Sequence, residues 1–323
     1  MKTGNKIFEE LPEVQEGVLL KNYTTYKIGG PAKYFFVAKT KSDLVSAVKT
    51  AKKLKLPVFI LGGGSNLLIS DKGFSGLAIK IDIFDIKFED NRALVGAGVN
   101  LTKLAYDSAE RGLAGAEWAA GIPGTVGGAI HGNAHAFGTK ISDTVKNVET
   151  IDLKTLEFKN FTREQCNFSL KNSIFKKNKN LVIISAILEL KKENPEDIKN
   201  HINGFLEHRR NKHPMNFPSA GSTFVNPLVK ITNKKLLEKF PELKEYNEKG
   251  AMPSWYLIKK SGLSGKKIGS AQISEKHCNF IINLGGAKAK DVLALMNLAK
   301  KKVKKTFGVS LESEVQFVGF KSI

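Results

Sequence analysis

Cysteine is scarce in this 323-residue chain: Cys166 and Cys278 are the only two, far apart and without the spacing of a metal site. Neither a disulfide framework nor a zinc site is therefore indicated, and we expect two buried or half-buried thiols and no bound metal. Long apolar runs are also absent, since none approaches the roughly 18 residues of a membrane span. The stretch from Met1 to Glu10 is charged and lacks the apolar core of a signal peptide. We therefore expect a soluble, cytoplasmic protein without a membrane partner.

Acidic residues are few compared with basic ones: 31 Asp and Glu against 51 Lys and Arg give a formal net charge of +20. Such a charge is typical of nucleic-acid binders, which neutralise phosphates with basic side chains. The lysines, however, are spread along the chain in pairs such as Lys52 and Lys53, and no arginine-rich tail occurs. We interpret them as a solvated surface and expect no nucleic-acid partner. A positive field would still help to capture a polyanionic small substrate.

The chain is too long for one compact core of the usual size, so we expect two or three domains. Hydrophobic periodicity predicts strands and helices along most of it. The predicted strands are 33–38, 57–61, 77–83, 93–98, 147–153, 181–190, 280–283 and 315–319, and the predicted helices are 43–55 with Ser42 as N-cap, 101–111, 195–212 and 289–306. This mixture predicts an α+β fold, with one domain before the helix at 195–212 and a smaller α+β unit from 254 to 319.

Two glycine-rich loops are the most unusual local feature. Gly62-Gly63-Gly64-Ser65-Asn66 directly follows a predicted strand, and consecutive glycines allow backbone N–H groups to approach a ligand such as a diphosphate without Cβ obstruction. A strained turn explains such a run equally well, and the dinucleotide fingerprint G-x-G-x-x-G is absent. A second, nearly uncharged loop runs from Gly121 to Ala129. The pair suggests one extended ligand lying across both loops.

These loops and several later motifs resemble the UDP-N-acetylenolpyruvoylglucosamine reductases, a family of bacterial peptidoglycan enzymes. The resemblance is carried by Thr24–Ala32, Leu61–Asn66, Gly121–Gly128, Pro218–Pro227, Gly269–Ser274 with Lys276-His277 and Asn279-Phe280, and Phe307–Val315. It covers about residues 20 to 319, and motifs in the same order along a whole chain are far more specific than any one of them. The short span after Phe175 resembles the branch of the family that lacks an extra tyrosine-bearing loop.

The resemblance implies a fold, cofactors and a reaction. It implies an FAD-binding domain of the vanillyl-alcohol-oxidase (PCMH) type with two α+β subdomains over 20–195, a smaller α+β substrate-binding domain over 205–306, and a C-terminal segment, 307–323, with a catalytic glutamate. NADPH would reduce non-covalently bound FAD, which would reduce UDP-N-acetylenolpyruvoylglucosamine to UDP-N-acetylmuramate, as in an FAD-containing UDP-N-acetylmuramate dehydrogenase. A monomer serving cell-wall biogenesis, cell shape and cell division is implied. The implied FAD contacts are Gly62, Gly63, Gly64, Ser65, Asn66, Gly121, Ile122, Pro123, Gly124, Thr125, Gly127, Gly128 and Asn133.

Three residues match the family's catalytic positions, one of them with a substitution. Ser222, in Gly-Ser-Thr-Phe, matches the serine that donates a proton to the reduced double bond, and Glu314 matches the glutamate that stabilises the enol-like intermediate. Lys171 stands where the family has an arginine. Lysine keeps the charge but loses the planar two-point fork for a carboxylate. The role falls to Lys171 or has moved to Arg209 or Arg210.

The substrate's uridine diphosphate has its own matching positions. Lys212 and Asn226 match family contacts, Arg210 is a plausible phosphate partner, and Gln272 and His277 lie in the family's Gln-x-Ser-x-Lys-His motif. Two other functions stay open at this point, because fold does not fix function. One is a flavin oxidase or dehydrogenase with another substrate. The other is a basic binding protein that kept the fold and lost catalysis.

Overall fold

The computed structural model describes residues 3–320, with side chains from residue 6 onward, and divides into two compact units. Unit 1 comprises residues 1–18, 32–64 and 74–211, and unit 2 comprises 19–31, 65–73 and 212–323. Each unit has its own cluster of buried apolar side chains. Neither unit is one continuous stretch of sequence, because residues 19–31 and 65–73 make most of their contacts with the C-terminal part of the chain. The domains expected from the sequence were continuous stretches.

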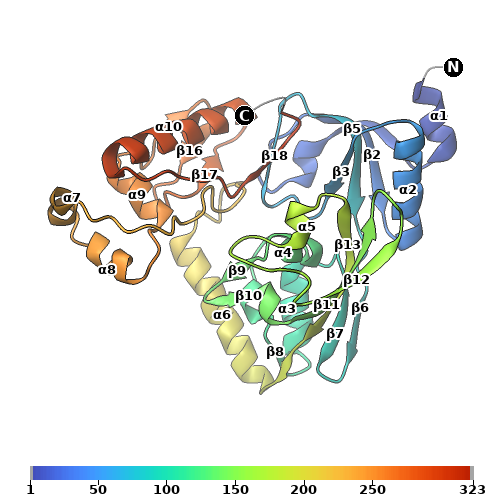
Figure 1. Ribbon diagram of the computed structural model, residues 1–323, viewed down its shortest axis with the longest axis horizontal. Coiled ribbons are helices and arrows are strands. Elements are labelled where there is room, and N and C mark those ends of the chain that lie inside the picture. The colour runs from blue at the N-terminus through green and yellow to red at the C-terminus, as the bar shows by residue number, and fades with distance from the viewer. Residues whose placement is uncertain (1–2, 321–323) are drawn as a thin grey trace. The chain divides into compact units, whose positions relative to one another are not determined.

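Unit 1 contains one sheet with parallel neighbours and one antiparallel sheet (Figure 1). The first sheet has the order β1 (Gln15–Leu19), β2 (Pro31–Ala38), β5 (Phe74–Ile81), β3 (Val58–Leu61). The second has the order β12 (Phe158–Thr162), β11 (Val145–Asp152), β13 (Leu181–Glu189), β7 (Arg92–Gly96), β6 (Ile86–Glu89). Two short pairs complete the unit: β8 (Leu113–Ala114) with β14 (Lys191–Lys192), and β9 (His135–Ala136) with β10 (Thr139–Lys140).

The helices of unit 1 pack against the sheets or against one another. They are α1 (Thr3–Glu10), α2 (Lys41–Lys53), α3 (Leu101–Ala109), α4 (Val126–His131), α5 (Ile174–Lys177) and α6 (Pro195–Lys212). In α2, Leu44 and Val48 are one turn apart and pack in the same core as Leu77 of β5.

Unit 2 is built on a small antiparallel sheet with a long helix. The sheet has the order β15 (Lys267–Ile268), β16 (Ala271–Ile273), β17 (Ile281–Asn283), and a parallel pair joins β4 (Leu67–Ile69) to β18 (Gln316–Val318). Its helices are α7 (Lys234–Lys239), α8 (Leu243–Glu248), α9 (Ser254–Lys260) and α10 (Ala289–Phe307). Helix α10 lies along β16 (Figure 1) and buries Val292, Leu295 and Val303. Gly308 ends it in the left-handed conformation, with φ of +73°.

The predicted elements are confirmed with boundaries shifted by a few residues, and one local prediction is wrong. Thr40, not Ser42, is the N-cap of α2, because Thr40 and Asp43 exchange side chain to backbone hydrogen bonds in a capping box. The last strand, predicted over 315–319, is β18 and begins at Gln316.

The two cysteines are free and buried in the described structure. Their burial agrees with the expectation from the sequence, and burial together with the nearby charge of Glu164 raises the pKa of Cys166 to about 12. Within residues 3–320, no helix is long and apolar enough to cross a membrane. No three His, Cys, Asp or Glu side chains of that part of the chain lie together as metal ligands.

Candidate functional site

The turn that carries Ser222 is shaped by the residue before it. Gly221 has φ of +74°, a conformation that glycine adopts without a Cβ penalty. The Oγ of Ser219 accepts the N–H of Gly221 at 3.4 Å, so Ser219 helps to form this turn. Ser222 itself is half-buried, followed by buried Thr223 and Phe224. Its hydroxyl therefore stands at the edge of the core of unit 2.

Asn279 clamps the backbone that follows Ser222. Its Oδ1 accepts the N–H of Phe224 at 3.0 Å, and its Nδ2 donates to the Phe224 carbonyl at 2.8 Å. Its own carbonyl accepts the N–H of Thr223 at 2.7 Å. Asn279 is only 4 % exposed, so these bonds replace water at every polar atom of its side chain. The sequence motif contained Asn279, but nothing in the sequence indicated this positioning role.

Glu314 lies across from the same turn. An isolated antiparallel bridge joins Phe224 to Ser313, and the N–H of Glu314 donates to the Thr223 carbonyl at 2.9 Å. Glu314 is half-buried, whereas Glu312 is exposed. Ser222 and Glu314 are 92 residues apart in the sequence. The structure thus brings together the two segments of unit 2 that are predicted to be catalytic.

Asn66 has a structural role that the sequence did not indicate. Its Nδ2 donates to the Glu314 carbonyl at 3.1 Å, and its own carbonyl accepts the N–H of Gln316 at 3.0 Å. The end of the first glycine loop, Ser65 and Asn66, therefore belongs to unit 2 and fixes the backbone of Glu314.

Of the residues expected to bind uridine diphosphate, some have exposed side chains and others form hydrogen bonds within the protein. Arg210 and Lys212, at the end of α6, are exposed. Oδ1 of Asn226 accepts the N–H of Ser254 at 3.0 Å, and Nε2 of Gln272 donates to the Gly265 carbonyl at 3.1 Å. Both amides thus already hold local backbone.

His277 lies in an aromatic group of unit 2. Its ring centroid is 5.4 Å from that of His213 and 5.0 Å from that of Phe280. Its Nδ1 is buried and has no hydrogen-bond partner in the described structure. Burial lowers the pKa of His277 to about 4, so the ring is neutral near pH 7.

The two glycine loops of unit 1 touch each other. A Cβ built on Gly63 would stand 2.7 Å from the Cα of Gly124, and one on Gly62 would stand 3.0 Å from Oγ1 of Thr125. Thr125 is the N-cap of α4. Glycine at 63 is therefore required by this close approach of two backbones. The two glycine loops therefore lie side by side at this point.

Lys171 occupies a strained position in unit 1. Its φ is +54°, within a tight turn closed by reciprocal backbone hydrogen bonds between Ser169 and Asn172. Left-handed backbone is uncommon for a lysine and is concentrated at functional sites. Nζ of Lys176 donates to the Lys171 carbonyl at 2.8 Å, which ties the turn to α5.

Asn133 connects the second glycine loop to this turn. Its Nδ2 donates to the Ser169 carbonyl at 2.9 Å, and its φ is +43°. Asn133 is 3 % exposed, and its Oδ1 has no partner among the described residues. A buried acceptor without a donor is costly, so this oxygen is suited to accept a hydrogen bond from an ordered water or a bound group.

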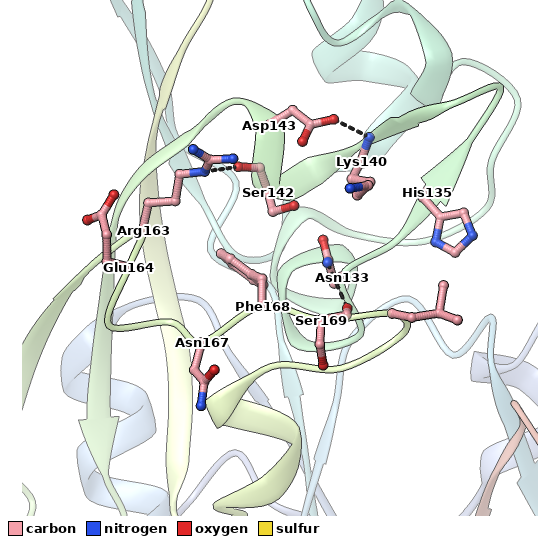
Figure 2. A pocket seen from close by; sticks show the side chains of 11 residues that line it. Asn133, His135, Lys140, Ser142, Asp143, Arg163, Glu164, Asn167, Phe168 and Ser169 are labelled. Carbon is pink, nitrogen blue, oxygen red and sulfur yellow. Dashed lines mark hydrogen bonds between the residues drawn. The ribbon is translucent and has the colours of Figure 1, made fainter. Parts of the chain in front are cut away.

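A hollow of about 460 Å³ borders Asn133 and the Lys171 turn (Figure 2). Its rim is polar: Nε of Arg163 donates to the Ser142 carbonyl at 2.7 Å, and the N–H of Lys140 donates to Asp143 at 2.9 Å. The sequence analysis assigned no role to Arg163 or Lys140. Apart from Asn133, the residues expected at the site do not line this hollow.

Comparisons with known proteins agree over nearly the whole chain. Residues 32–155 match the FAD binding domain family, and residues 213–318 match the C-terminal domain of UDP-N-acetylenolpyruvoylglucosamine reductase. The UDP-N-acetylenolpyruvoylglucosamine reductase of Anoxybacillus flavithermus is 38 % identical over 98 % of this chain and 99 % of its own length. That of Caldicellulosiruptor bescii is 40 % identical over 93 % of this chain and 89 % of its own. The crystal structure of the Thermus caldophilus UDP-N-acetylenolpyruvylglucosamine reductase superposes with a TM-score of 0.74 at 31 % identity, covering 94 % of this chain and 98 % of that one.

Proposed function

Because the chain belongs to the UDP-N-acetylenolpyruvoylglucosamine reductase family, we propose that Ser222, Glu314 and Lys171 are the catalytic residues of an enzyme with that activity. The enzyme is an FAD-containing oxidoreductase that reduces UDP-N-acetylenolpyruvoylglucosamine to UDP-N-acetylmuramate with NADPH, in peptidoglycan precursor synthesis. When bound, FAD carries hydride from NADPH to the enolpyruvyl double bond. The protein supplies the proton for the neighbouring carbon and holds the charge that develops on the substrate carboxylate.

The hydrogen bond between the N–H of Glu314 and the Thr223 carbonyl is the observation that carries this proposal. It holds the backbones of the proton donor and the stabilising carboxyl group in a fixed register, as pre-organised catalysis requires. Ser222 Oγ donates a proton to the substrate carbon, and Glu314 stabilises the enol-like form of the carboxylate. Asn279 orients the Ser222 turn without touching the substrate.

Lys171 supplies the cation for the substrate carboxylate. Its backbone is left-handed, and the turn that carries it is anchored through Ser169 to Asn133. Lysine offers a point charge in place of the guanidinium fork, so the carboxylate is held by charge more than by two-point geometry. Arg210 and Lys212, both exposed, bind the diphosphate of the substrate, and Asn226, Gln272 and His277 complete that part of the site.

The residues of the two glycine loops fit FAD. Gly63 leaves no room for a Cβ beside Gly124, so the two loop backbones lie against each other. Consecutive glycines without Cβ atoms would let a dinucleotide approach the backbone N–H groups. Asn133 keeps an unpartnered buried acceptor beside the second loop. We propose that the loop residues named in the sequence analysis hold FAD without a covalent bond, in a domain over 20–195, with substrate binding over 205–306 and the glutamate segment over 307–323.

The cellular setting is also a proposal. The enzyme acts in the cytoplasm as a monomer, serves cell shape and division through cell-wall synthesis, and has no nucleic-acid partner. The scattered lysines support this last point, since Lys52 and Lys53 sit in the last turn of α2, where positive charge stabilises a helix end.

The absorbance spectrum of the purified protein tests the function most directly. A yellow protein that oxidises NADPH only when given UDP-N-acetylenolpyruvoylglucosamine supports the proposal. A yellow protein that ignores this substrate would favour a flavin oxidase or dehydrogenase of another specificity. A colourless protein that binds DNA would favour the basic binding protein.

A further inference from the structure

Arg209 occupies a core position on α6. The buried residues of this helix are Ile198, Ile202 and Arg209, and Leu206 packs against the same group. These positions follow helical spacing, so Arg209 extends an apolar stripe. Its exposed fraction is 8 %, whereas the next residue, Arg210, is exposed. Arginine is almost never this buried unless a partner neutralises it.

No such partner exists among residues 3–320. Arg209 has one hydrogen bond, from Nη2 to the Trp118 carbonyl at 3.3 Å, and its buried Nε has none. It forms no ion pair with any carboxylate of the described chain. Burial lowers the pKa of Arg209 to about 10, which still leaves it charged at neutral pH. An unpaired buried charge costs several kcal/mol of desolvation. An anion bound to the guanidinium of Arg209 would offset this desolvation cost.

The guanidinium lies against the second glycine loop. A Cβ built on Gly121 would stand 3.3 Å from Cδ and 3.8 Å from Nε of Arg209. Gly121 also has φ of +71°, and its N–H donates to Oγ1 of Thr102 at 3.0 Å, which fixes the loop. On another side, the ring of Phe137 lies 5.0 Å from the guanidinium carbon. Phe137 in turn stacks on Phe205 of α6, with ring centroids 4.3 Å apart. Arg209 is thus held rigidly beside the loop that touches Gly63.

We propose that Arg209 binds an anionic acceptor of FAD through its free Nε–H. The inference rests on the proposed function, because it assumes that the glycine loops hold FAD. FAD offers two such acceptors. Its diphosphate is negative in both redox states, whereas the isoalloxazine ring becomes negative only when hydride adds two electrons and one proton. Arg209 is therefore a binding residue for the cofactor, separate from Lys171, which faces the substrate carboxylate.

The affinity for FAD and the midpoint potential of the bound flavin distinguish these two acceptors. Arg209→Met keeps the apolar stem and removes the charge, and Arg209→Lys keeps the charge. If the acceptor is the diphosphate, Arg209→Met weakens the binding of oxidised FAD by tenfold or more. If it is the reduced ring, oxidised FAD binds within twofold of wild type and the midpoint potential falls by about 30 mV for each tenfold loss in preference for the reduced form. Arg209→Lys should recover part of either effect.

Lys199→Met is the matched control, because Lys199 is exposed on the same helix and loses the same charge. It should change neither measurement. Unchanged affinity and potential in Arg209→Met would overturn the proposal, including the case in which only the Michaelis constant for the enolpyruvyl substrate rises. Equal losses in Arg209→Lys and Arg209→Met would also overturn it, since packing would then explain the effect. Wild-type protein that binds no FAD would instead refute the proposed function.

Discussion

The N–H of Glu314 donates to the carbonyl of Thr223 at 2.9 Å, so the two segments with the predicted proton donor and stabilising carboxyl group share one backbone bridge. Asn66 holds the Glu314 carbonyl at 3.1 Å, and Asn279 clamps the other strand of the bridge at Phe224. These hydrogen bonds therefore hold the backbone of both segments, from which the side chains of Ser222 and Glu314 extend.

Ser222→Ala should separate the two half-reactions. Reduction of the flavin by NADPH needs no proton from serine, so bleaching of the flavin band should stay nearly intact. Reoxidation by UDP-N-acetylenolpyruvoylglucosamine should slow by about 100-fold to 10,000-fold, the usual contribution of a positioned acid. Anaerobic stopped-flow absorbance measures both phases. Ser219→Ala, in the same turn, should change neither much, and equal slowing of both phases in Ser222→Ala would mean that this serine shapes the flavin site instead.

Lys171→Arg should retain or raise turnover, because arginine restores the guanidinium fork at the same backbone position. Lys171→Met should raise the barrier to substrate reduction by about 2 kcal/mol or more, the range for one lost charged donor. Steady-state kcat/KM with the enolpyruvyl substrate checks both variants. Lys177→Met, an exposed lysine of α5, serves as the control. Wild-type kcat/KM in the Met variant would show that the reaction does not use Lys171.

Gly63→Ala should weaken FAD binding by tenfold or more, because the new Cβ would stand 2.7 Å from the Cα of Gly124 and force the loops apart. Overpacking of this kind also costs about 1–3 kcal/mol of stability. Fluorescence titration of apoprotein with FAD, and thermal unfolding, measure the two effects. In Gly204→Ala on α6, the new Cβ meets no other part of the described chain within 4 Å. This control should bind FAD normally and gain about 0.5–1 kcal/mol. Normal FAD binding in Gly63→Ala would contradict the close contact.

Acid should destabilise the protein through His131 in unit 1 and His277 in unit 2. Burial lowers the pKa of His277 to about 4, and burial together with the charge of Lys176 lowers that of His131 to about 4. Because the unfolded chain takes up protons near pH 6.5 and the folded chain does not, stability should fall as pH drops from about 6.5 to about 4. The slope should be on the order of 1 kcal/mol per pH unit for each histidine.

Denaturant unfolding at several pH values measures this slope. His277→Gln and His131→Gln should each flatten the curve in that window while leaving the slope above pH 7 unchanged. His201, an exposed histidine of α6, provides the control substitution His201→Gln, which should leave the curve as it is. Equal slopes in all four proteins would show that neither buried histidine takes up a proton on unfolding.

The sequence by itself determined the secondary structure and the family. Helix α10 and strand β13 follow from local apolar periodicity, which depends only on neighbouring residues. Ser222, Glu314 and Lys171 followed from ordered motifs that resemble one family. The local prediction of Ser42 as N-cap was wrong because Thr40 is also a good capping residue and forms the reciprocal pair with Asp43.

The tertiary structure alone decided which groups are paired and which are not. Asn279 and Phe224 are 55 residues apart, Asn66 and Glu314 are 248 apart, and Arg209 and Trp118 are 91 apart. Such pairs depend on how the chain folds back, so no local pattern predicts them. The unpartnered Nε of Arg209 could not be predicted from the sequence either. A buried charged group without a partner can be recognised only when the positions of all its neighbours are known.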